Sequence, residues 1–232
     1  MANKIDLPVL NNDKSLTTKE KLLYAGIQLF SERGYESTTT RMIAEKAGTN
    51  IASISFHFGN KENYYYAVLT YVADKIRQDY TPFFKQVMLL HKEHTPSPEE
   101  AWKLIEQYVD FLLSIITEAT GEPGSTNTAI MNLLFQEQMM SSTDYPPITS
   151  VLCTESESVL NLLLRDYWQV QDEEKAAIVS RTITGAIISF GEHPTFIRRE
   201  LEKGIYSKLD DTVWNTLREF IFDSIKNYRP EK

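Results

Sequence analysis

The side chains best suited to chemistry lie close together, between positions 39 and 61 of a chain of 232 residues. Thr39, Thr40 and Arg41 carry hydroxyl and guanidinium groups that can bind a phosphate or, for the arginine, a guanine edge. Lys61 is expected in the first turn of a helix, where the helix dipole disfavours a cation by roughly 0.3–1 kcal/mol and a nearby phosphate would reverse the sign. Each group taken alone could also be an ordinary cap or a solvated side chain. Together they suit contacts to a polyanion.

Signatures of catalysis are absent from the sequence. It holds no Gly-x-Ser-x-Gly elbow, phosphate loop, His-Glu-x-x-His motif or dinucleotide glycine fingerprint. His91 and His94 have the i, i+3 spacing of a metal pair, but no third ligand accompanies them, so a solvated helix end is favoured. We therefore expect no enzyme activity, no metal and no cofactor.

The sequence also indicates a compartment. Cys153 is the single cysteine, so neither an internal disulfide nor a zinc thiolate cluster can form, and a reducing compartment fits best. No apolar run approaches the roughly 18 residues needed to span a bilayer. The first residues lack the basic segment and apolar stretch of a secretory signal. We therefore expect a cytoplasmic protein with no membrane partner.

Charge is distributed unevenly along the chain. The formal net charge is −8, but residues 1–61 hold eight basic and six acidic residues, a net of +2. Residues 62–232 hold 16 basic and 26 acidic residues, a net of −10. A mildly basic head on an acidic body is compatible with a DNA-binding module joined to a regulatory domain. Chance unevenness on a solvated surface explains the charge alone about as well.

The elements that would position the candidate groups are helices. Residues 1–15 are polar without a period and are expected to form a flexible arm. A capping box over residues 17–20 predicts the start of the first helix, and Gly34 ends its apolar stripe. The hydroxyls of residues 37–40 would cap a second short helix, which Gly48 would end in a left-handed conformation.

A third short helix is predicted over about residues 50–57, and its two faces differ. At 100° per residue, Ile54 and Phe58 share the side that can seal a small core. The opposite side and the leading end carry small, polar and exposed apolar residues: Asn50, Ile51, Ala52, Ser53 and Phe56. A face of this kind suits entry into a DNA major groove, and an exposed Phe56 would contact a thymine methyl or a sugar.

The rest of the chain is also predicted to be helical. Asn60 can cap a long helix that runs toward Tyr80, and Pro82 is expected to end or kink it. A cap, a helix-initial proline and first-turn acids over residues 97–100 predict the start of the next helix, which runs to about residue 120. Further helices are expected over 126–141, 147–168, 172–190 and 211–228. Strand alternation and repeats are missing, so the fold class is all-α.

The run from Gly34 to Glu62 resembles the DNA-binding domain of the TetR family of regulators. The resemblance covers about residues 15–65 and is carried by these motifs at the family's spacing: Gly34-Tyr35, the threonine-rich cap, Ile43-Ala44, Ala47-Gly48 and Phe58-Gly59-Asn60-Lys61-Glu62. The start of the third helix, residues 50–52, is similar to the CecR-like subgroup. The resemblance implies an all-helical homodimer whose recognition helices occupy successive major grooves of a near-palindromic double-stranded DNA operator. It also implies repression that an unknown small-molecule effector relieves.

The family's contact positions carry over residue by residue. Thr40 and Arg41 match its second-helix contacts. Residues 50–53 match the base-facing start of its recognition helix, and His57 and Lys61 match its phosphate anchors. Ser55 stands where the family commonly has tyrosine, so a phosphate or base contact is lost there. The predicted DNA-binding set is Thr39, Thr40, Arg41, Asn50, Ile51, Ala52, Ser53, Ser55, Phe56, His57 and Lys61.

The resemblance divides the chain into a helix-turn-helix domain over 16–62 and a helical ligand-binding and dimerisation domain over 63–232. By family analogy the last two long helices form the dimer interface, through Ile183, Ile187, Phe190, Trp214, Leu217, Phe220 and Ile221. The alternative is that these stripes are internal core. A ligand pocket is predicted from Trp102, Phe111, Phe135, Met139 and Tyr145, with plain core packing as the alternative for each.

Three functions remain open at the level of sequence. The first is a ligand-responsive repressor, and the second is a DNA-binding activator or architectural protein without a ligand. The third, an all-helical enzyme, is disfavoured by the missing motifs. The part of the chain beyond residue 65 is far larger than dimerisation requires, which favours a ligand pocket and hence the first function.

Overall fold

The computed structural model describes residues 16–121, 126–140, 146–192, 199–201, 209–228 and 230. The predicted arm over 1–15 and Tyr145 lie outside these residues. The described elements are α1 (Thr18–Ser37), α2 (Thr40–Ala47), α3 (Ala52–Phe58), α4 (Lys61–Glu93), α5 (Pro98–Gly121), α6 (Thr126–Met140), α7 (Pro147–Thr149), the π-helical turn η1 (Ser150–Glu155), α8 (Ser156–Trp168), α9 (Glu173–Glu192) and α11 (Asp211–Asn227). These ranges contain no strand, which confirms the all-α prediction.

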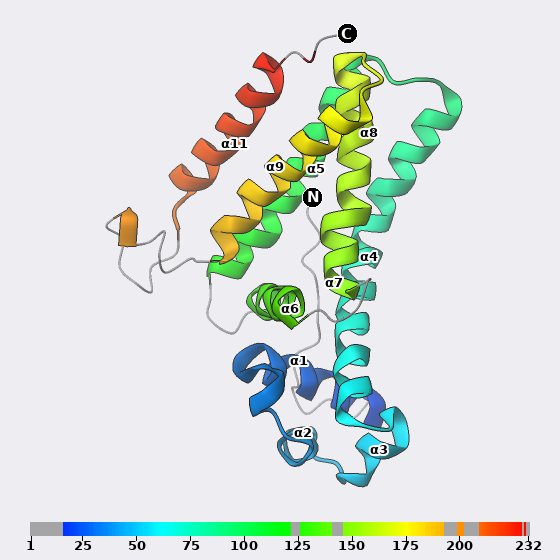
Figure 1. The fold of residues 1–232 in the computed structure, drawn as a ribbon, viewed down its shortest axis with the longest axis vertical. Helices are drawn as coiled ribbons and strands as arrows, with labels where there is room; N and C mark the ends of the chain where they lie inside the picture. Colours follow the sequence, from blue (N-terminus) through cyan, green and yellow to red (C-terminus); the bar gives the residue numbers. More distant parts are fainter. Residues whose placement is uncertain are drawn as a thin grey trace.

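Figure 1 shows how the helices are arranged. Helix α1 and the short helices α2 and α3 gather at one end of the molecule, and the long α4 runs from them into the body. There α5, α8 and α9 pack against one another, while α11 packs on α5. None of the helices in the described part of the chain combines the length and the apolar character that crossing a bilayer requires.

The helix starts follow the predicted caps. Thr17 and Glu20 form a reciprocal capping box at α1, and Ser97 and Glu100 form one at α5. At α4, the Asn60 Oδ1 atom accepts a hydrogen bond from the Asn63 amide at 2.8 Å. Because each cap satisfies backbone N–H groups that the helix leaves free, the sequence fixes these boundaries locally.

Gly34 and Thr38 make the corner between α1 and α2. Gly34 has φ 78° and ψ 170°, so the helical path breaks where the apolar stripe was predicted to end. Thr38 is fully buried, and its Oγ1 atom donates to the carbonyls of Leu29 at 3.2 Å and Gly34 at 2.8 Å. Thr38 therefore holds the corner by bonding back onto the helix that it follows.

The long helix α4 does not end at Pro82 but continues to Glu93. The Thr81 hydroxyl donates to the Arg77 carbonyl at 2.6 Å, one turn before the proline. Arg77 itself reaches across to the body, with its guanidinium 3.0 Å and 2.8 Å from the two carboxylate oxygens of Glu155. Packing against the body therefore outweighs the loss of one helical hydrogen bond at the proline.

Two contacts join the head to the body. The buried Tyr64 on α4 donates its hydroxyl to the Leu22 carbonyl on α1 at 2.5 Å, and its ring lies against Gly26. Further along α1, the side-chain amides of Asn132 and Gln136 on α6 donate to the Ser31 carbonyl at 3.3 Å and 3.5 Å. Helix α1 is thus held by both α4 and α6.

Candidate nucleic-acid interface

Helix α3 presents its predicted outer face to solvent. Phe56 is 84% exposed and Ile51 is 50% exposed, whereas Ile54 is 1% exposed. Phe58 is half-buried, and its ring centroid lies 4.9 Å from that of Tyr64. The structure therefore confirms the predicted division of the helix into a core side and an open side. Figure 1 places α2 and α3 at the end of the molecule farthest from α11.

The leading end of α3 is fixed by Asn50. Its Oδ1 atom accepts a hydrogen bond from the Ala52 amide at 2.9 Å, and its carbonyl accepts one from the Ser53 amide at 2.9 Å. The side-chain oxygen is therefore used as a cap, and the Nδ2 group remains as a donor. Ala52 and Ser55 are exposed, and Ser53 is half-buried.

The start of α2, which precedes α3 in the chain, carries the threonine and arginine residues that were predicted to contact DNA. The Thr39 Oγ1 atom accepts a hydrogen bond from the Met42 amide at 3.2 Å. Thr39 and Arg41 are exposed, and Thr40 is half-buried. Gly48 ends α2 at φ 62° and ψ 37°, the left-handed conformation that was predicted. The hydroxyl at the cap is therefore structural, while Arg41 is free to reach outward.

Lys61 is held in place by an aromatic ring that the sequence reading did not include in the site. Its Nζ atom lies 4.2 Å from the centroid of the Tyr35 ring, a cation–π contact. Burial, together with the carboxylates of Glu62 and Glu36, raises the pKa of Tyr35. The ring offsets part of the unfavourable position of a cation at the first turn of α4. The only sequence signal for this role is the glycine–aromatic pair at Gly34-Tyr35.

The histidines fall into two groups. His57 is exposed on α3, and its ring centroid lies 5.0 Å from that of Phe56. His91 Nε2 lies 2.6 Å from an Asp166 carboxylate oxygen, and His94 Nε2 lies 3.1 Å from Glu100. His91 and His94 therefore have separate carboxylate partners and do not share a site. Within the described residues, no group of three or more metal-ligating side chains is found.

The residues predicted to line a ligand pocket are dispersed. Trp102 packs against Tyr167 and Phe222, at ring centroid distances of 5.1 Å and 5.3 Å. The ring centroid of Phe111 lies 6.1 Å from that of Tyr80. Phe135 is half-buried against the core, Met139 is 87% exposed, and Tyr145 lies outside the described residues. The described four residues pack in different parts of the body, because periodicity identifies an apolar face but not which neighbour it meets.

Most of the residues predicted for the dimer interface are buried within the protomer. Five of them are under 9% exposed: Ile183, Ile187, Trp214, Leu217 and Ile221. These side chains lie on the α9 and α11 faces that pack against the body. Phe190 is half-buried and Phe220 is 68% exposed. The outer side of α9 instead exposes Ile178, at 59%, and Gly185, whose Cβ position has no atom within 4 Å.

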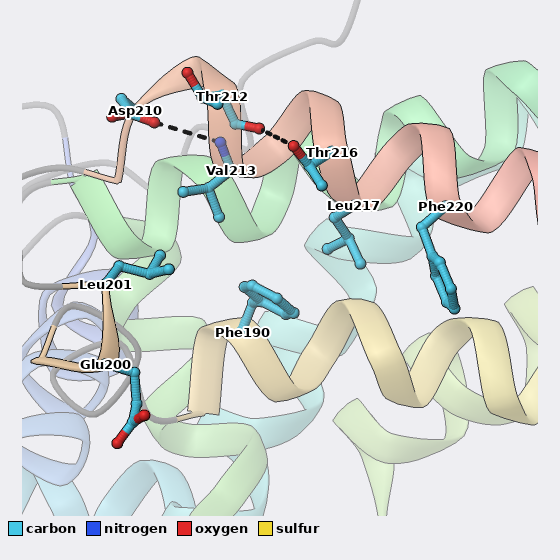
Figure 2. Close-up of a pocket in the computed structure, with 9 residues that line it drawn as sticks. All are labelled: Phe190, Glu200, Leu201, Asp210, Thr212, Val213, Thr216, Leu217 and Phe220. Carbon is cyan, nitrogen blue, oxygen red and sulfur yellow. Dashed lines mark hydrogen bonds between the residues drawn. The ribbon is translucent and has the colours of Figure 1, made fainter.

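A groove of about 630 Å³ lies between α9 and α11. Figure 2 shows Phe190 from α9 and Val213, Leu217 and Phe220 from α11 turned into this space. Polar groups lie at its edge, where the Asp210 carboxylate caps α11 by accepting the Val213 amide. The lining is mostly apolar, and the volume is in the range of small-molecule sites.

A buried carboxylate between α8 and α9 was not found from sequence. The Glu157 side chain is 11% exposed, and its Oε2 atom lies 3.2 Å from Arg181 Nε. Burial raises the pKa of Glu157 to about 7, although Arg181 acts in the opposite direction. No local pattern indicates this site, because Glu157 is one of 32 acidic residues and its burial comes from helix packing.

Comparison with known proteins agrees with the geometry of the head. Residues 22–66 match the family described as bacterial regulatory proteins, tetR family. The chain is 24% identical over 207 residues to the HTH-type transcriptional dual regulator CecR of Shigella flexneri, covering 74% of this chain and 90% of that protein. It is 34% identical over 62 residues to the HTH-type transcriptional repressor AcnR of Corynebacterium glutamicum, covering 27% of this chain and 33% of AcnR.

The whole fold also has a solved counterpart. The transcriptional regulator FadR from Bacillus subtilis, in complex with stearoyl-CoA, superimposes with a TM-score of 0.56 at 16% identity. The match covers 87% of this chain and 96% of FadR, so it includes both the head and the body. The head motifs and the family match identify the head as the DNA-binding domain of a TetR family transcriptional regulator, and the FadR match shows that the chain shares that protein's fold.

Proposed function

We propose that this chain is a homodimeric repressor that a small-molecule effector releases from a near-palindromic DNA operator. The observation that carries the proposal is the open face of α3, which leaves Ile51 and Phe56 exposed at the end of the molecule. Exposed apolar surface that gathers at one end of a molecule is typical of an interaction site. The names of relatives support regulation of transcription, AcnR as a repressor and CecR as a dual regulator. Such a regulator works in the cytoplasm of a bacterium, where the DNA lies.

The DNA contacts divide into two kinds. Asn50, Ile51, Ala52, Ser53, Ser55 and Phe56 face the bases, while Thr39, Thr40, Arg41, His57 and Lys61 face the backbone phosphates. Arg41 is exposed at the start of α2 and can reach either a phosphate or a guanine. Lys61 is held by Tyr35 beside the free amides at the start of α4.

The dimer is proposed to form through the outer sides of α9 and α11. Ile178 is an exposed apolar residue of α9, and Phe220, which also borders the groove between α9 and α11, is one of α11. Gly185 leaves the α9 surface open, so a helix of the partner can approach closely. Two heads joined in this way would contact half-sites spaced by about 34–36 Å or a multiple.

The effector is proposed to bind in the groove between α9 and α11. The groove has room for a small molecule, and its lining of Phe190, Val213, Leu217 and Phe220 favours an apolar ligand. FadR, which shares the fold, was solved in complex with stearoyl-CoA. Because the same two helices form the proposed dimer interface, an occupant would change how the protomers meet. The dimer conformation in which the two heads have the spacing of the operator would then be less populated.

The DNA-binding proposal is tested by salt titration of operator binding with Lys61→Ala. Each phosphate contact contributes about 0.9 to the slope of log K against log salt concentration, and a dimer carries two Lys61 residues. The slope should therefore become shallower by about 1.8, with affinity reduced for every DNA sequence. Lys92→Ala, at the exposed far end of α4, is the matched control and should leave the slope unchanged. A Lys61→Ala dimer with the wild-type slope would refute the assignment.

A further inference from the structure

The exposed face of α3 is poor in groups that distinguish bases by hydrogen bonding. Residues 50–58 contain no Lys, Arg or Gln, the side chains that make paired hydrogen bonds to base edges. Ser53 and Ser55 carry hydroxyls, which both donate and accept, so they tolerate several bases. Because His57 is assigned to the phosphates, Asn50, at the leading end of α3, is the one residue that is left for directional recognition of the bases.

Asn50 is itself restricted by its cap. A carboxamide recognises adenine by donating to N7 and accepting from the N6 amino group at the same time. The Asn50 Oδ1 atom already accepts the Ala52 amide at 2.9 Å. Only the Nδ2 donor is therefore free while α3 keeps its first turn, and a single donor does not separate adenine N7 from guanine N7 or O6.

Large apolar groups are open to solvent on this face and at the leading end of α3. Phe56 is 84% exposed and Ile51 is 50% exposed, and Ala52 lies exposed between them in sequence. In the major groove the one apolar group that a base pair presents is the C5-methyl of thymine, which cytosine lacks. Burying one methyl-sized group changes affinity by about fourfold, which corresponds to about 0.8 kcal/mol.

From these contacts we infer that α3 recognises its operator chiefly through thymine C5-methyl groups, with Phe56 as the specificity-determining residue. The inference rests on the proposed DNA binding and adds the chemical feature that is recognised. Operators of this protein therefore carry a thymine under Phe56 in each half-site. At that position cytosine is rejected for the missing methyl rather than for a wrong hydrogen bond.

The test changes the DNA and leaves the protein intact. A high-affinity duplex is first selected from random sequences with the purified full chain. Each thymine of the half-site is then replaced, in both half-sites at once, by 2′-deoxyuridine, which keeps the hydrogen-bonding groups and lacks the methyl. At one position or more the wild-type dimer should bind about 16-fold more weakly, fourfold for each half-site. Replacing adenines under α3 by 7-deazaadenine should change binding less than threefold.

Variants then assign the methyl contact to one side chain. Phe56→Ala should bind the thymine and deoxyuridine duplexes equally at the sensitive position, and its exposed site leaves the fold unaffected. Leu89→Ala, an equally apolar change at a 59% exposed position on α4, should keep the wild-type discrimination. Uniform binding to all deoxyuridine duplexes, discrimination retained by Phe56→Ala, or a tenfold loss with 7-deazaadenine would each overturn the inference. Failure to select any preferred duplex would instead refute the proposed DNA binding.

Discussion

Glu157 should make the stability of this protein depend on pH in an unusual direction. The carboxyl is buried between α8 and α9, and its Arg181 partner is 62% exposed, so water weakens the attraction between them. Burial therefore outweighs the ion pair, and the pKa rises from an ordinary 4.5 to about 7. The neighbouring Cys153 thiol, whose pKa burial raises to about 11, stays neutral over this range and adds no compensating charge.

The sign and size of the effect follow from linkage. Between pH 4.5 and 7 the folded state holds a proton on Glu157 that the unfolded state has lost, so stability falls as the pH rises. Below pH 4.5 the carboxyl is neutral in both states and carries no penalty. Each pKa unit is worth 1.36 kcal/mol. A shift from 4.5 to about 7 thus corresponds to a loss of about 3 kcal/mol by pH 7.

Glu157→Gln isolates this contribution, because glutamine resembles the neutral carboxyl at every pH. Urea denaturation curves of both proteins, measured at one fixed protein concentration and at several pH values from 4.5 to 7.5, give the difference in unfolding free energy. The two should be nearly equal at pH 4.5, and the variant should be more stable by about 3 kcal/mol at pH 7.5. Glu174→Gln, at an exposed position on α9, controls for the loss of one negative charge. A difference that stays constant across this range would refute the reasoning.

Three further substitutions test the packing. Gly26→Ala places a methyl against the Tyr64 hydroxyl and 2.6 Å from Val68 Cγ2, so overpacking should lower the unfolding free energy by about 1–3 kcal/mol in urea denaturation. Thr38→Val keeps the shape but removes a buried donor to two carbonyls, which should cost about 1–2 kcal/mol in the same assay. Gly185→Ala adds helix propensity at an open site, so it should stabilise the protomer by up to about 1 kcal/mol while weakening the proposed dimer in sedimentation equilibrium. A stabilised variant with unchanged dimerisation would place the interface elsewhere.

The head could be predicted almost entirely because its structure is local. The caps at Thr17, Thr39 and Asn60 bond to amides three residues away, and Gly48 ends its helix through its own dihedral angles. Helical periodicity correctly placed Ile54 inward and Phe56 outward, because that prediction requires only the position of each residue on one helix that packs on one core. Interactions of this range are encoded within a few residues, so the candidate DNA contacts follow from a short stretch of sequence.

The body could be predicted as helices but not as an arrangement of them. Trp102 and Phe135 have the apolar periodicity of a pocket lining, yet one packs on Tyr167 and Phe222 and the other on the general core. The apolar stripes of α9 and α11 are wider than one packed helix face requires, but most of the residues predicted there for the dimer interface are buried within the protomer. Which apolar face meets which helix depends on contacts between distant segments, and no local pattern specifies them.

The charge balance links the head's chemistry to the regulation of the whole molecule. A head with a net charge of +2, joined to a body of −10, gains little from non-specific attraction to DNA. One head that relies on a few phosphate contacts and on apolar recognition by α3 would bind weakly, so stable binding requires two heads at the correct spacing. Helix α1 is bonded to both α4 and α6, and through them that spacing depends on the body. In the proposed dimer, a small change in how the two bodies meet would therefore suffice to release the operator, because neither head could hold it alone.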